Sequence, residues 1–383
     1  MDNDLIDLMT QWRHALHTHP ETAFEEIATA KLVAGVLRRH GFEVHEGIGQ
    51  TGVVGTLSRS AGPAIGLRAD MDALPITEAN GFAHRSQNEG KMHACGHDGH
   101  TAMLLGAAVA LSRDPAWAGT VHVIFQPAEE GPAAGARSMV EDGLFERFAC
   151  DAVFGMHNWP GLPRGHFAIN DGPMMSSLDT FEIVVDGKGS HAAMPEEGSD
   201  VLVCAGQIVI ALQTIVSRRI SPGESGVVSV TQIHGGEAWN VLPDRAVIRG
   251  TVRCFSSAVQ ERVRTSIGEI STGIAQALGV SATLDYRFGY PATINSPAQA
   301  DLAASAAEAT VGSSNVRRGC RPSMASEDFA FMLHEKPGAY IWIGVDEGAT
   351  AAPLHNPRYD FNDAALAIGA NYWVNLVKLF GAR

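Results

Sequence analysis

The sequence predicts an α/β protein in which a mostly parallel sheet domain is interrupted by an inserted ferredoxin-like α+β module. Its 383 residues exceed what one hydrophobic core comfortably holds, so two domains are expected. Strands and helices alternate over residues 52–160, which is typical of a parallel sheet covered by helices. From Asp179 the order becomes strand–helix–strand–strand–helix–strand, as in a ferredoxin-like module. We therefore expect one domain at residues 1–175 and 291–383, and the inserted module at residues 176–290.

The elements of the first domain follow from apolar spacing and turn residues. Apolar residues three to four apart predict two helices between residues 4 and 40, separated by Pro20. Further strands are expected at Gly52–Leu57, Ala64–Ala69, Thr120–Gln126, Ala152–Met156 and Ala339–Val345, and helices at Thr101–Ser112, Ala136–Asp142, Pro297–Val311 and Asp363–Leu379. A further helix is expected to begin within Ser323–Phe329, with a serine cap and acidic residues in its first turn.

The inserted module has its own set of elements. Strands are expected at Phe181–Asp186, Val227–His234, Ala246–Phe255 and Ala282–Phe288, with helices at Val201–Ser217 and Ala258–Leu278. The turn residues Asp171–Gly172–Pro173 and Tyr290–Pro291 mark its two ends.

Composition excludes several classes of partner. With 28 basic and 42 acidic residues the net charge is −14, which argues against nucleic acid or an anionic membrane as a partner but not against a small anionic substrate. No apolar run is long enough to span a bilayer. The five scattered cysteines suggest no disulfide framework, and the acidic N-terminus lacks the apolar core of a signal peptide. We therefore expect a cytoplasmic protein.

The segment Met92–His100 concentrates chemistry-bearing residues. It holds three histidines, a cysteine and an aspartate in nine positions, directly before an apolar helix. In an extended segment Cys95 and His97 would point to one side, where a thiolate and an imidazole can share a metal ion. A reduced cysteine beside surface histidines is the alternative, but the density of ligand types favours a metal site.

Other ligand-type residues follow the predicted strands, at the edge where ligands bind in parallel sheets. They are Asp70 and Asp72, Glu129 and Glu130, and His157. Four segments, including the one with Cys95 and His97, thus deliver such residues to one edge. The segment His17–Glu21 also carries polar residues, but it reads equally well as a helix end and is assigned no metal.

This supply suits a two-metal hydrolytic centre. The candidate ligands are Cys95, His97, Glu130, His157 and His355. In the pair Glu129–Glu130, one carboxylate can bind metal while its neighbour faces the substrate as general base; a solvated acidic loop is the alternative. Asp72 would orient a ligand histidine. For Asp70, a structural salt bridge to Arg68 is the alternative to a role at the metal site.

Three residues of the inserted module are candidates for substrate contact. His191 lies in the loop Gly187–Ala193, and Asn240 ends the loop Gly235–Asn240. These two side chains can stabilise a developing oxyanion, and Arg253 can clamp a substrate carboxylate. A lone arginine on a strand is more often a salt-bridge partner.

These segments together resemble the dinuclear metal-dependent amidohydrolases of the aminoacylase/carboxypeptidase clan. The branch is that of hippurate hydrolases, N-acyl-amino-acid amidohydrolases, N-acetyldiaminopimelate deacetylases and plant auxin-conjugate hydrolases. The resemblance runs nearly end to end, through RADMDALP (68–75), MHACGHDGH (92–100), QPAEEG (126–131), GMHNWPG (155–161), GKGSHAAMP (187–195), WNVLPD (239–244), GTVR (250–253), SEDF (326–329) and LHNP (354–357). Met324–Ala325 departs from the Met-Gly that relatives often carry.

The resemblance implies a role for each candidate. Cys95, His97, Glu130, His157 and His355 would bind two divalent ions. A thiolate favours softer ions than carboxylates do, so the mixed set leaves zinc, manganese, cobalt and nickel open. Glu129 would be the general base. The sheet domain would be catalytic and the module a lid and dimerisation domain, in which His191 and Asn240 complete the partner subunit's site and Arg253 contacts the substrate carboxylate. A homodimer or higher homo-oligomer is expected.

The expected reaction is hydrolysis of the amide bond of an N-acyl amino acid, such as a hippurate-like or N-acetyl substrate. A dipeptidase or carboxypeptidase of the same clan is the alternative within enzymes. A non-catalytic metal-binding module is the alternative of another class, and the presence of Glu129 argues against it.

Overall fold

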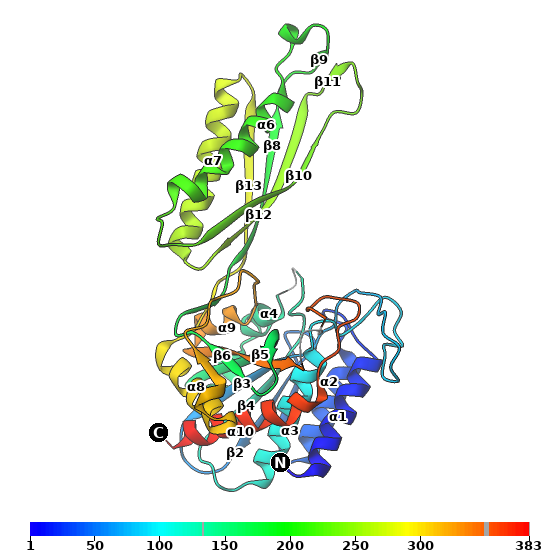
Figure 1. The fold of residues 1–383 in the computed structure, drawn as a ribbon, viewed down its shortest axis with the longest axis vertical. Helices are drawn as coiled ribbons and strands as arrows, with labels where there is room; N and C mark the ends of the chain where they lie inside the picture. The colour runs from blue at the N-terminus through cyan, green and yellow to red at the C-terminus, as the bar shows by residue number, and fades with distance from the viewer. Residues whose placement is uncertain (132–133, 348–351, 383) are drawn as a thin grey trace. The chain divides into compact units, whose positions relative to one another are not determined.

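The computed structural model describes residues 1–131, 134–347 and 352–382. The chain divides into two compact units (Figure 1). Unit 1 comprises Met1–Met174, Ile294–Pro322 and Asp328–Arg383, and unit 2 comprises Met175–Thr293 and Ser323–Glu327. The predicted α/β class is confirmed, with a large, mostly parallel sheet in unit 1 and an α+β arrangement in unit 2.

Unit 1 is built on an eight-stranded sheet in the order β1-β2-β4-β3-β5-β16-β6-β15. The strands are β1 (Glu43–Ile48), β2 (Gly52–Ser58), β3 (Ala64–Asp70), β4 (Thr120–Gln126), β5 (Ala152–Pro163), β6 (Phe167–Ile169), β15 (Val316–Arg318) and β16 (Gly338–Asp346). The central strands β4, β3, β5 and β16 are mutually parallel, whereas β1, β2 and β6 pair antiparallel with their neighbours nearer the centre. The carboxyl ends of the adjacent parallel strands β4, β3 and β5 therefore lie together, as the site prediction requires.

Helices cover this sheet. They are α1 (Asn3–Thr18), α2 (Ile27–Arg39), α3 (His97–Arg113), α4 (Gly135–Glu141), α5 (Leu144–Arg147), α8 (Pro297–Val311), α9 (Ala330–Glu335) and α10 (Leu366–Gly381). Helix α3 is buried along nearly its whole length, because its residues after the first turn are apolar or small and it packs between α1, α10 and the sheet. None of the helices in the described ranges is long and apolar enough to cross a membrane.

Unit 2 contains a four-stranded antiparallel sheet in the order β10-β12-β8-β13, with two helices on one face (Figure 1). Its elements are β8 (Leu178–Asp186), α6 (Val201–Leu212), β10 (Gly226–Gly235), β12 (Arg245–Cys254), α7 (Ser257–Ala277) and β13 (Ser281–Tyr290). The strand order is that of a ferredoxin-like fold, as predicted. Alternate residues of β8 (Phe181, Ile183 and Val185) enter the core beneath the helices.

Short elements complete the chain. Strands β9 (Ser190–His191) and β11 (Val241–Leu242) form a two-stranded ribbon, and β7 (Pro173–Met175) pairs with β14 (Thr293–Ile294). A π-helical turn covers Ile215–Arg219, and 3₁₀ turns cover Pro195–Glu197, Ser313–Asn315 and Asp363–Ala365. The predicted helix Val201–Ser217 therefore ends earlier as an α-helix than expected, at Leu212.

The helix predicted to begin within Ser323–Phe329 is wrong, because α9 begins only at Ala330. Two polar side chains of this segment contact other strands instead of capping the predicted helix. Ser326 Oγ accepts a hydrogen bond from Arg253 at 3.0 Å, and the buried Asp328 carboxylate pairs with Arg68 at 3.2 Å. Serine and aspartate favour a helix start only when their side chains are free to cap it.

Candidate metal centre

Cys95 and His97 meet through a tight turn at the start of α3, and not through an extended segment. Gly96 takes the left-handed conformation with φ 88°, and His97 is the first residue of α3. This turn brings a ligand atom of Cys95, one of His97 and one of Glu130 within 4.8 Å of one another. A sulfur, an imidazole and a carboxylate at this separation are a suitable donor set for a transition-metal ion.

We expect Gly96→Ala to weaken metal binding. A Cβ at this position would lie 2.5 Å from Asn158 Oδ1, and alanine also pays about 1 kcal/mol or more for positive φ. The turn must then open and separate Cys95 from His97, so we expect zinc affinity to fall by about 10-fold or more. Gly41→Ala is the matched control, since Gly41 has φ +80° but nothing within 4 Å of its Cβ position. Zinc titration of both variants against a chromophoric chelator tests this, and equal affinities would contradict it.

His97 contacts Asp72, the residue predicted to orient a ligand histidine. Its Nδ1 lies 2.9 Å from the backbone oxygen of Asp72 and 3.3 Å from its Oδ1. Nε2 is buried and lacks a hydrogen-bond partner among the described residues, although Asp70 Oδ2 lies 3.8 Å away. Burial lowers the pKa of His97, but Asp70 and Asp72 outweigh it and raise the pKa to about 10. A cation is therefore strongly favoured at Nε2, which fits a metal ion as well as a proton.

Cys95 faces a second histidine. Its Sγ lies 3.5 Å from Nε2 of His157, while Nδ1 of His157 lies 2.6 Å from the backbone oxygen of Asn158 and donates to it. That bond leaves Nε2 free to bind a metal. His157 lies within β5, which continues to Pro163 instead of ending at Met156 as predicted.

Charge around Cys95 also points to a cation. Burial raises the pKa of the Cys95 thiol well above its usual value, and the carboxylates of Glu130, Glu129 and Asp70 raise it further. A thiolate and several carboxylates cannot share a buried space without positive charge between them. The donor set of this chain therefore fits divalent metal ions.

Glu130 connects the cluster to a segment from the far end of the chain. Its Oε1 lies 3.2 Å from Nε2 of His355, and its backbone N–H donates to Asp72 Oδ2 at 2.8 Å. His355 has φ 63°, and its backbone N–H donates to the Ala94 oxygen at 2.8 Å. The His355 side chain is 54% exposed, unlike the other four candidate ligands, so it lies at the solvent side of the cluster.

Glu129, the candidate base, is 7% exposed.

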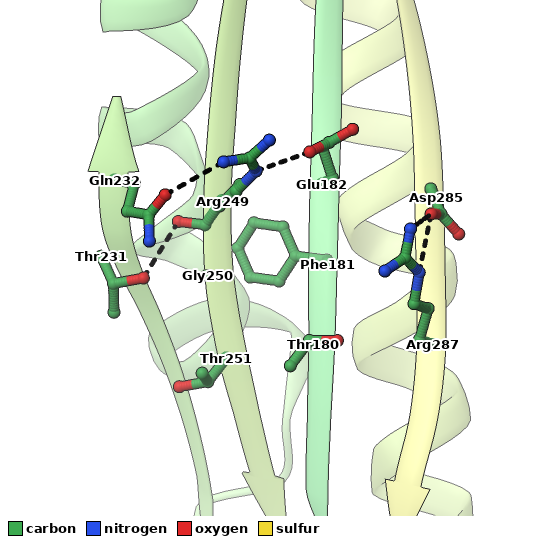
Figure 2. Close-up of a pocket in the computed structure, with 10 residues that line it drawn as sticks. All are labelled: Thr180, Phe181, Glu182, Thr231, Gln232, Arg249, Gly250, Thr251, Asp285 and Arg287. Atoms are coloured by element: carbon green, nitrogen blue, oxygen red, sulfur yellow. Dashed lines mark hydrogen bonds and ion pairs between the residues drawn. The ribbon is translucent and has the colours of Figure 1, made fainter. Parts of the chain in front are cut away.

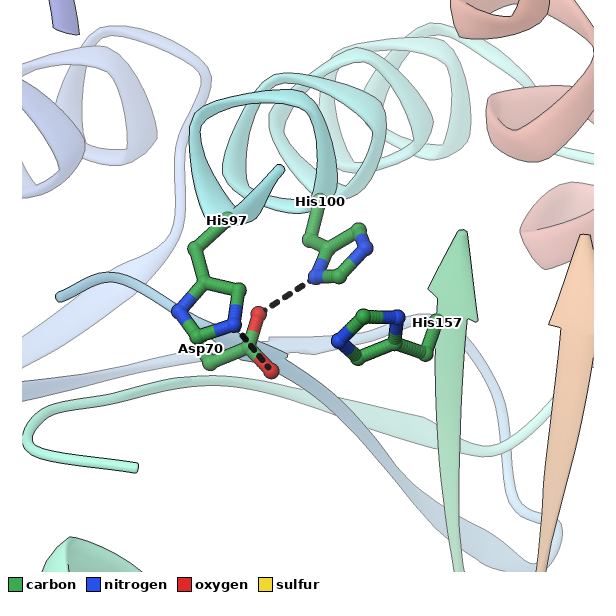
Figure 3. A group of neighbouring side chains, drawn as sticks. All are labelled: Asp70, His97, His100 and His157. Atoms are coloured by element: carbon green, nitrogen blue, oxygen red, sulfur yellow. Dashed lines mark hydrogen bonds and ion pairs between the residues drawn. The ribbon is translucent and has the colours of Figure 1, made fainter. Parts of the chain in front are cut away.

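Sequence reasoning missed a buried network behind these candidates. Asp70 Oδ1 accepts from His100 Nδ1 at 2.5 Å (Figure 3). The other ring nitrogen of His100 lies 2.5 Å from Asn158 Oδ1. Asn158 Nδ2 donates to the Tyr359 hydroxyl at 2.6 Å. The salt bridge weighed for Asp70 is present, at 2.7 Å from Arg68. The network was signalled only by His100 standing in the Cys/His segment.

A second buried cluster supports the start of α3 from the side of α1. Asp98, next to His97 in sequence, lies 3.2 Å from Arg13 and 2.9 Å from His17 Nδ1. The other nitrogen of His17 lies 3.2 Å from Glu78. The polar segment at the end of α1 thus has a role in holding α3.

We expect this cluster to make stability fall with rising pH. The titratable and charged groups around the ring are Arg13, Glu78, His84, His93 and Asp98. Burial lowers the pKa of His17, but Asp98 and Glu78 outweigh it and raise the pKa to about 9. Because the folded pKa exceeds the unfolded value, the stabilisation is complete below about pH 6.5 and is lost as pH rises through 9, by about 3 kcal/mol.

Urea unfolding of metal-free protein between pH 6 and 9.5 measures this change. His17→Gln is the control: because it removes this titrating group, the fall in the free energy of unfolding between those pH values should become smaller, and what remains belongs to other groups such as His97, whose pKa is also raised. A wild-type free energy of unfolding that stays constant across this window would contradict the prediction.

The three candidates of the inserted module all lie in unit 2. His191 on β9 pairs in register with Val241 on β11, and Ala192 N–H donates to the Asn240 oxygen at 3.0 Å. The ribbon thus brings His191 and Asn240 side by side, both exposed. Arg253 on β12 lies apart from them and is half-buried, and burial lowers its pKa.

A hollow on the open face of the unit 2 sheet is a weaker candidate site. It has a volume of about 270 Å³ and lies over β10, β12, β8 and β13 (Figure 2). Its charged groups neutralise one another: Arg249 pairs with Glu182 at 2.6 Å, and Arg287 pairs with Asp285. Side chains already paired at a surface offer a ligand little.

Known proteins are similar to this chain in sequence and in fold. A model of peptidase family M20/M25/M40 matches residues 66–379. Hippurate hydrolase of Campylobacter jejuni is 42% identical over 377 residues, covering 97% of each chain. N-acetylcysteine deacetylase of Bacillus subtilis is 39% identical, covering 96% of this chain and 95% of that protein. A solved Bacillus subtilis structure, described as a dinuclear metal-binding peptidase from the M20 family, has a TM-score of 0.87 at 34% identity, covering 100% of this chain and 99% of that one.

Proposed function

The chain belongs to peptidase family M20/M25/M40, and we propose that it is a metal-dependent amidohydrolase that cleaves the amide bond of N-acyl amino acids. The observation that carries the proposal is the cluster of the buried Cys95 thiol and His97 imidazole with the partly exposed Glu130 carboxylate, which follows the acid Glu129 in sequence. The relatives named above, a hippurate hydrolase and an N-acetylcysteine deacetylase, favour acyl amino acids over dipeptides as substrates.

We assign the metal ligands to the residues that meet around Cys95. They are Cys95, His97, Glu130, His157 and His355. Two divalent ions bound there, from the set zinc, manganese, cobalt and nickel, would polarise the amide carbonyl and acidify a water molecule. Asp72 holds the His97 ring by accepting from Nδ1, so Nε2 remains the ligand atom.

Glu129 is the proposed general base and acid. It takes a proton from the water whose oxygen attacks the acyl carbon, and it passes that proton to the amine nitrogen as the carbon–nitrogen bond breaks. The products are a carboxylic acid and a free amino acid. Its low exposure keeps bulk water away from the proton being transferred.

Residues of unit 2 are proposed to complete the substrate site. Arg253 contacts the substrate carboxylate, and His191 with Asn240 stabilises the oxyanion in the site of a partner subunit. A homodimer through unit 2 is supported by apolar side chains exposed on α6, among them Val203 at 53% and Ile210 at 70%. A cytoplasmic location is supported by five cysteines that are all unpaired and buried.

An activity screen tests the proposed reaction. Metal-free protein is reloaded with zinc, manganese, cobalt or nickel and assayed on N-acetyl- and N-benzoyl-amino acids beside matched dipeptides. Release of free amino acid from the acyl substrates is the expected result. Cleavage of dipeptides alone would move the protein to the peptidases, and no turnover despite stoichiometric metal would leave a binding module.

Complementation tests the role of His191 across subunits. A heterodimer of His191→Ala and Glu129→Gln chains, purified through two different tags, retains one site with an intact Glu129 and a partner's intact His191. Roughly half of wild-type activity is therefore expected if His191 acts across the dimer, whereas each homodimer is inactive. An inactive heterodimer would place His191 in its own subunit's site.

A further inference from the structure

Glu26 is a fully buried acid whose side chain bonds to segments outside its own helix. It stands at the start of α2 but makes no capping hydrogen bond to that helix. Its two oxygens bind other segments: Oε1 accepts from Ala128 N–H at 2.9 Å, and Oε2 accepts from the Thr51 hydroxyl at 2.6 Å. Glu26 thus connects α2 to the loop that follows β4.

That loop carries the proposed base in an unusual backbone conformation. Ala128, the residue before Glu129, has φ 49°, which a residue with a Cβ adopts only when the surroundings hold it there. On the other side, Glu130 N–H donates to Asp72 Oδ2 at 2.8 Å. The amide groups on both sides of Glu129 are therefore held by carboxyl oxygens from distant segments.

We propose that Glu26 is a positioning residue for Glu129. By accepting a hydrogen bond from the Ala128 N–H, Glu26 fixes the left-handed residue that precedes Glu129. Asp72 fixes the residue that follows Glu129 in the same way, by accepting from the Glu130 N–H. This inference rests on the proposed role of Glu129 as general base. A base that transfers protons must be held within a few tenths of an ångström, and misplacement by about 1 Å can cost 10²-fold in rate.

Stability at neutral pH does not account for a carboxyl group at this position. Burial raises the pKa of Glu26 to about 7, although its bond to Thr51 opposes this. Because the pKa of Glu26 is higher in the folded than in the unfolded protein, its contribution to stability is complete below the unfolded pKa near 4.5. That contribution is lost as the pH rises towards 7. What the side chain supplies at neutral pH is therefore a hydrogen-bond acceptor at a fixed place.

Three variants separate this role from a general effect on folding. Glu26→Gln keeps an oxygen that can accept from Ala128, whereas Glu26→Ala removes it and Glu26→Asp withdraws it by one methylene. Thr51→Val is the matched control, because it removes the other partner of Glu26 and leaves the bond to Ala128. If Glu26→Ala does not fold, Glu26→Asp carries the same prediction with a smaller effect.

Two measurements are made on each variant. Amide exchange in metal-free protein, followed on peptides covering residues 125–130, should be about 10-fold faster in Glu26→Ala and within about 3-fold of wild type in Glu26→Gln and Thr51→Val. On an N-acyl amino acid, kcat of the metal-loaded Glu26→Ala enzyme should fall by about 10- to 100-fold with KM and metal content nearly unchanged, while Glu26→Gln rescues it.

The outcomes discriminate clearly. Unchanged exchange in Glu26→Ala, wild-type kcat despite faster exchange, or a glutamine variant as slow as the alanine variant would each overturn the positioning role while the wild type stays active. If wild type loaded with each metal hydrolyses no acyl amino acid, the proposed function itself fails, and the catalytic part of this inference fails with it.

Discussion

Glu129→Gln is expected to lower kcat for an N-acyl amino acid by about 10²- to 10⁴-fold and to leave the bound metal unchanged. The amide has nearly the size of the carboxylate but cannot take a proton from water. Glu129 is close enough to Cys95 to raise the pKa of its thiol but is not among the proposed ligands, so its loss should spare metal content. Steady-state kinetics and elemental analysis of the same preparation give both quantities.

Glu130→Gln is the informative comparison, since it changes the adjacent residue in the same way. There the metal should be lost together with the activity, because Glu130 contacts both the Cys95 group and His355. Glu141→Gln, at an exposed site, controls for the loss of one charge. Near-normal turnover by Glu129→Gln would refute the assignment of the base.

Cys95→Ala should have the largest effect on metal binding, reducing bound metal from about two ions per chain to below about one. Its sulfur lies near His97 and Glu130 and, at 3.5 Å, near His157 Nε2. Removing it therefore weakens the contacts on both sides of the cluster. Elemental analysis measures the loss, and the thiolate charge-transfer absorption of the cobalt-loaded protein should disappear.

Cys320→Ala is the matched control for this variant. Cys320 is also a buried, unpaired thiol in unit 1, but its sulfur lies against Met174 instead of a histidine. Its substitution should leave metal content and cobalt absorption unchanged. Two metal ions retained by Cys95→Ala would refute a central thiolate and favour a site formed by histidines and carboxylates alone.

The elements that the sequence predicted well are those with a strong local pattern. The strand Thr120–Gln126 and the helix Pro297–Val311 have the predicted ends, because each is a buried apolar run or an alanine-rich run bounded by turn residues. Strand β1 (Glu43–Ile48) was not predicted. It lies at the sheet edge, is largely exposed and has charged residues or histidine at half of its positions, so it lacks the pattern of a buried strand.

The candidate site divides in the same way. Its proposed ligands are residue types that stand out in any sequence, so they could be selected before their positions were known. Glu26 could not, since one glutamate in a helical stretch carries no signal of a bond to Ala128, about a hundred residues away. The left-handed conformation of Gly96 could not be predicted for a related reason, because a single glycine does not reveal which conformation it adopts.

The position of β16 has a consequence for synthesis of the chain on the ribosome. Strands β5 and β6 are neighbours in sequence, yet β16 lies between them in the sheet. Until Gly338–Asp346 has emerged, the nascent chain presents β5 as an open edge, while the unit 2 sheet, made from residues 178–290, can already close. His355 emerges later still. The nascent protein therefore exposes an aggregation-prone edge to chaperones while residues 164–337 are made, and hydrolytic competence arises only after His355 has emerged.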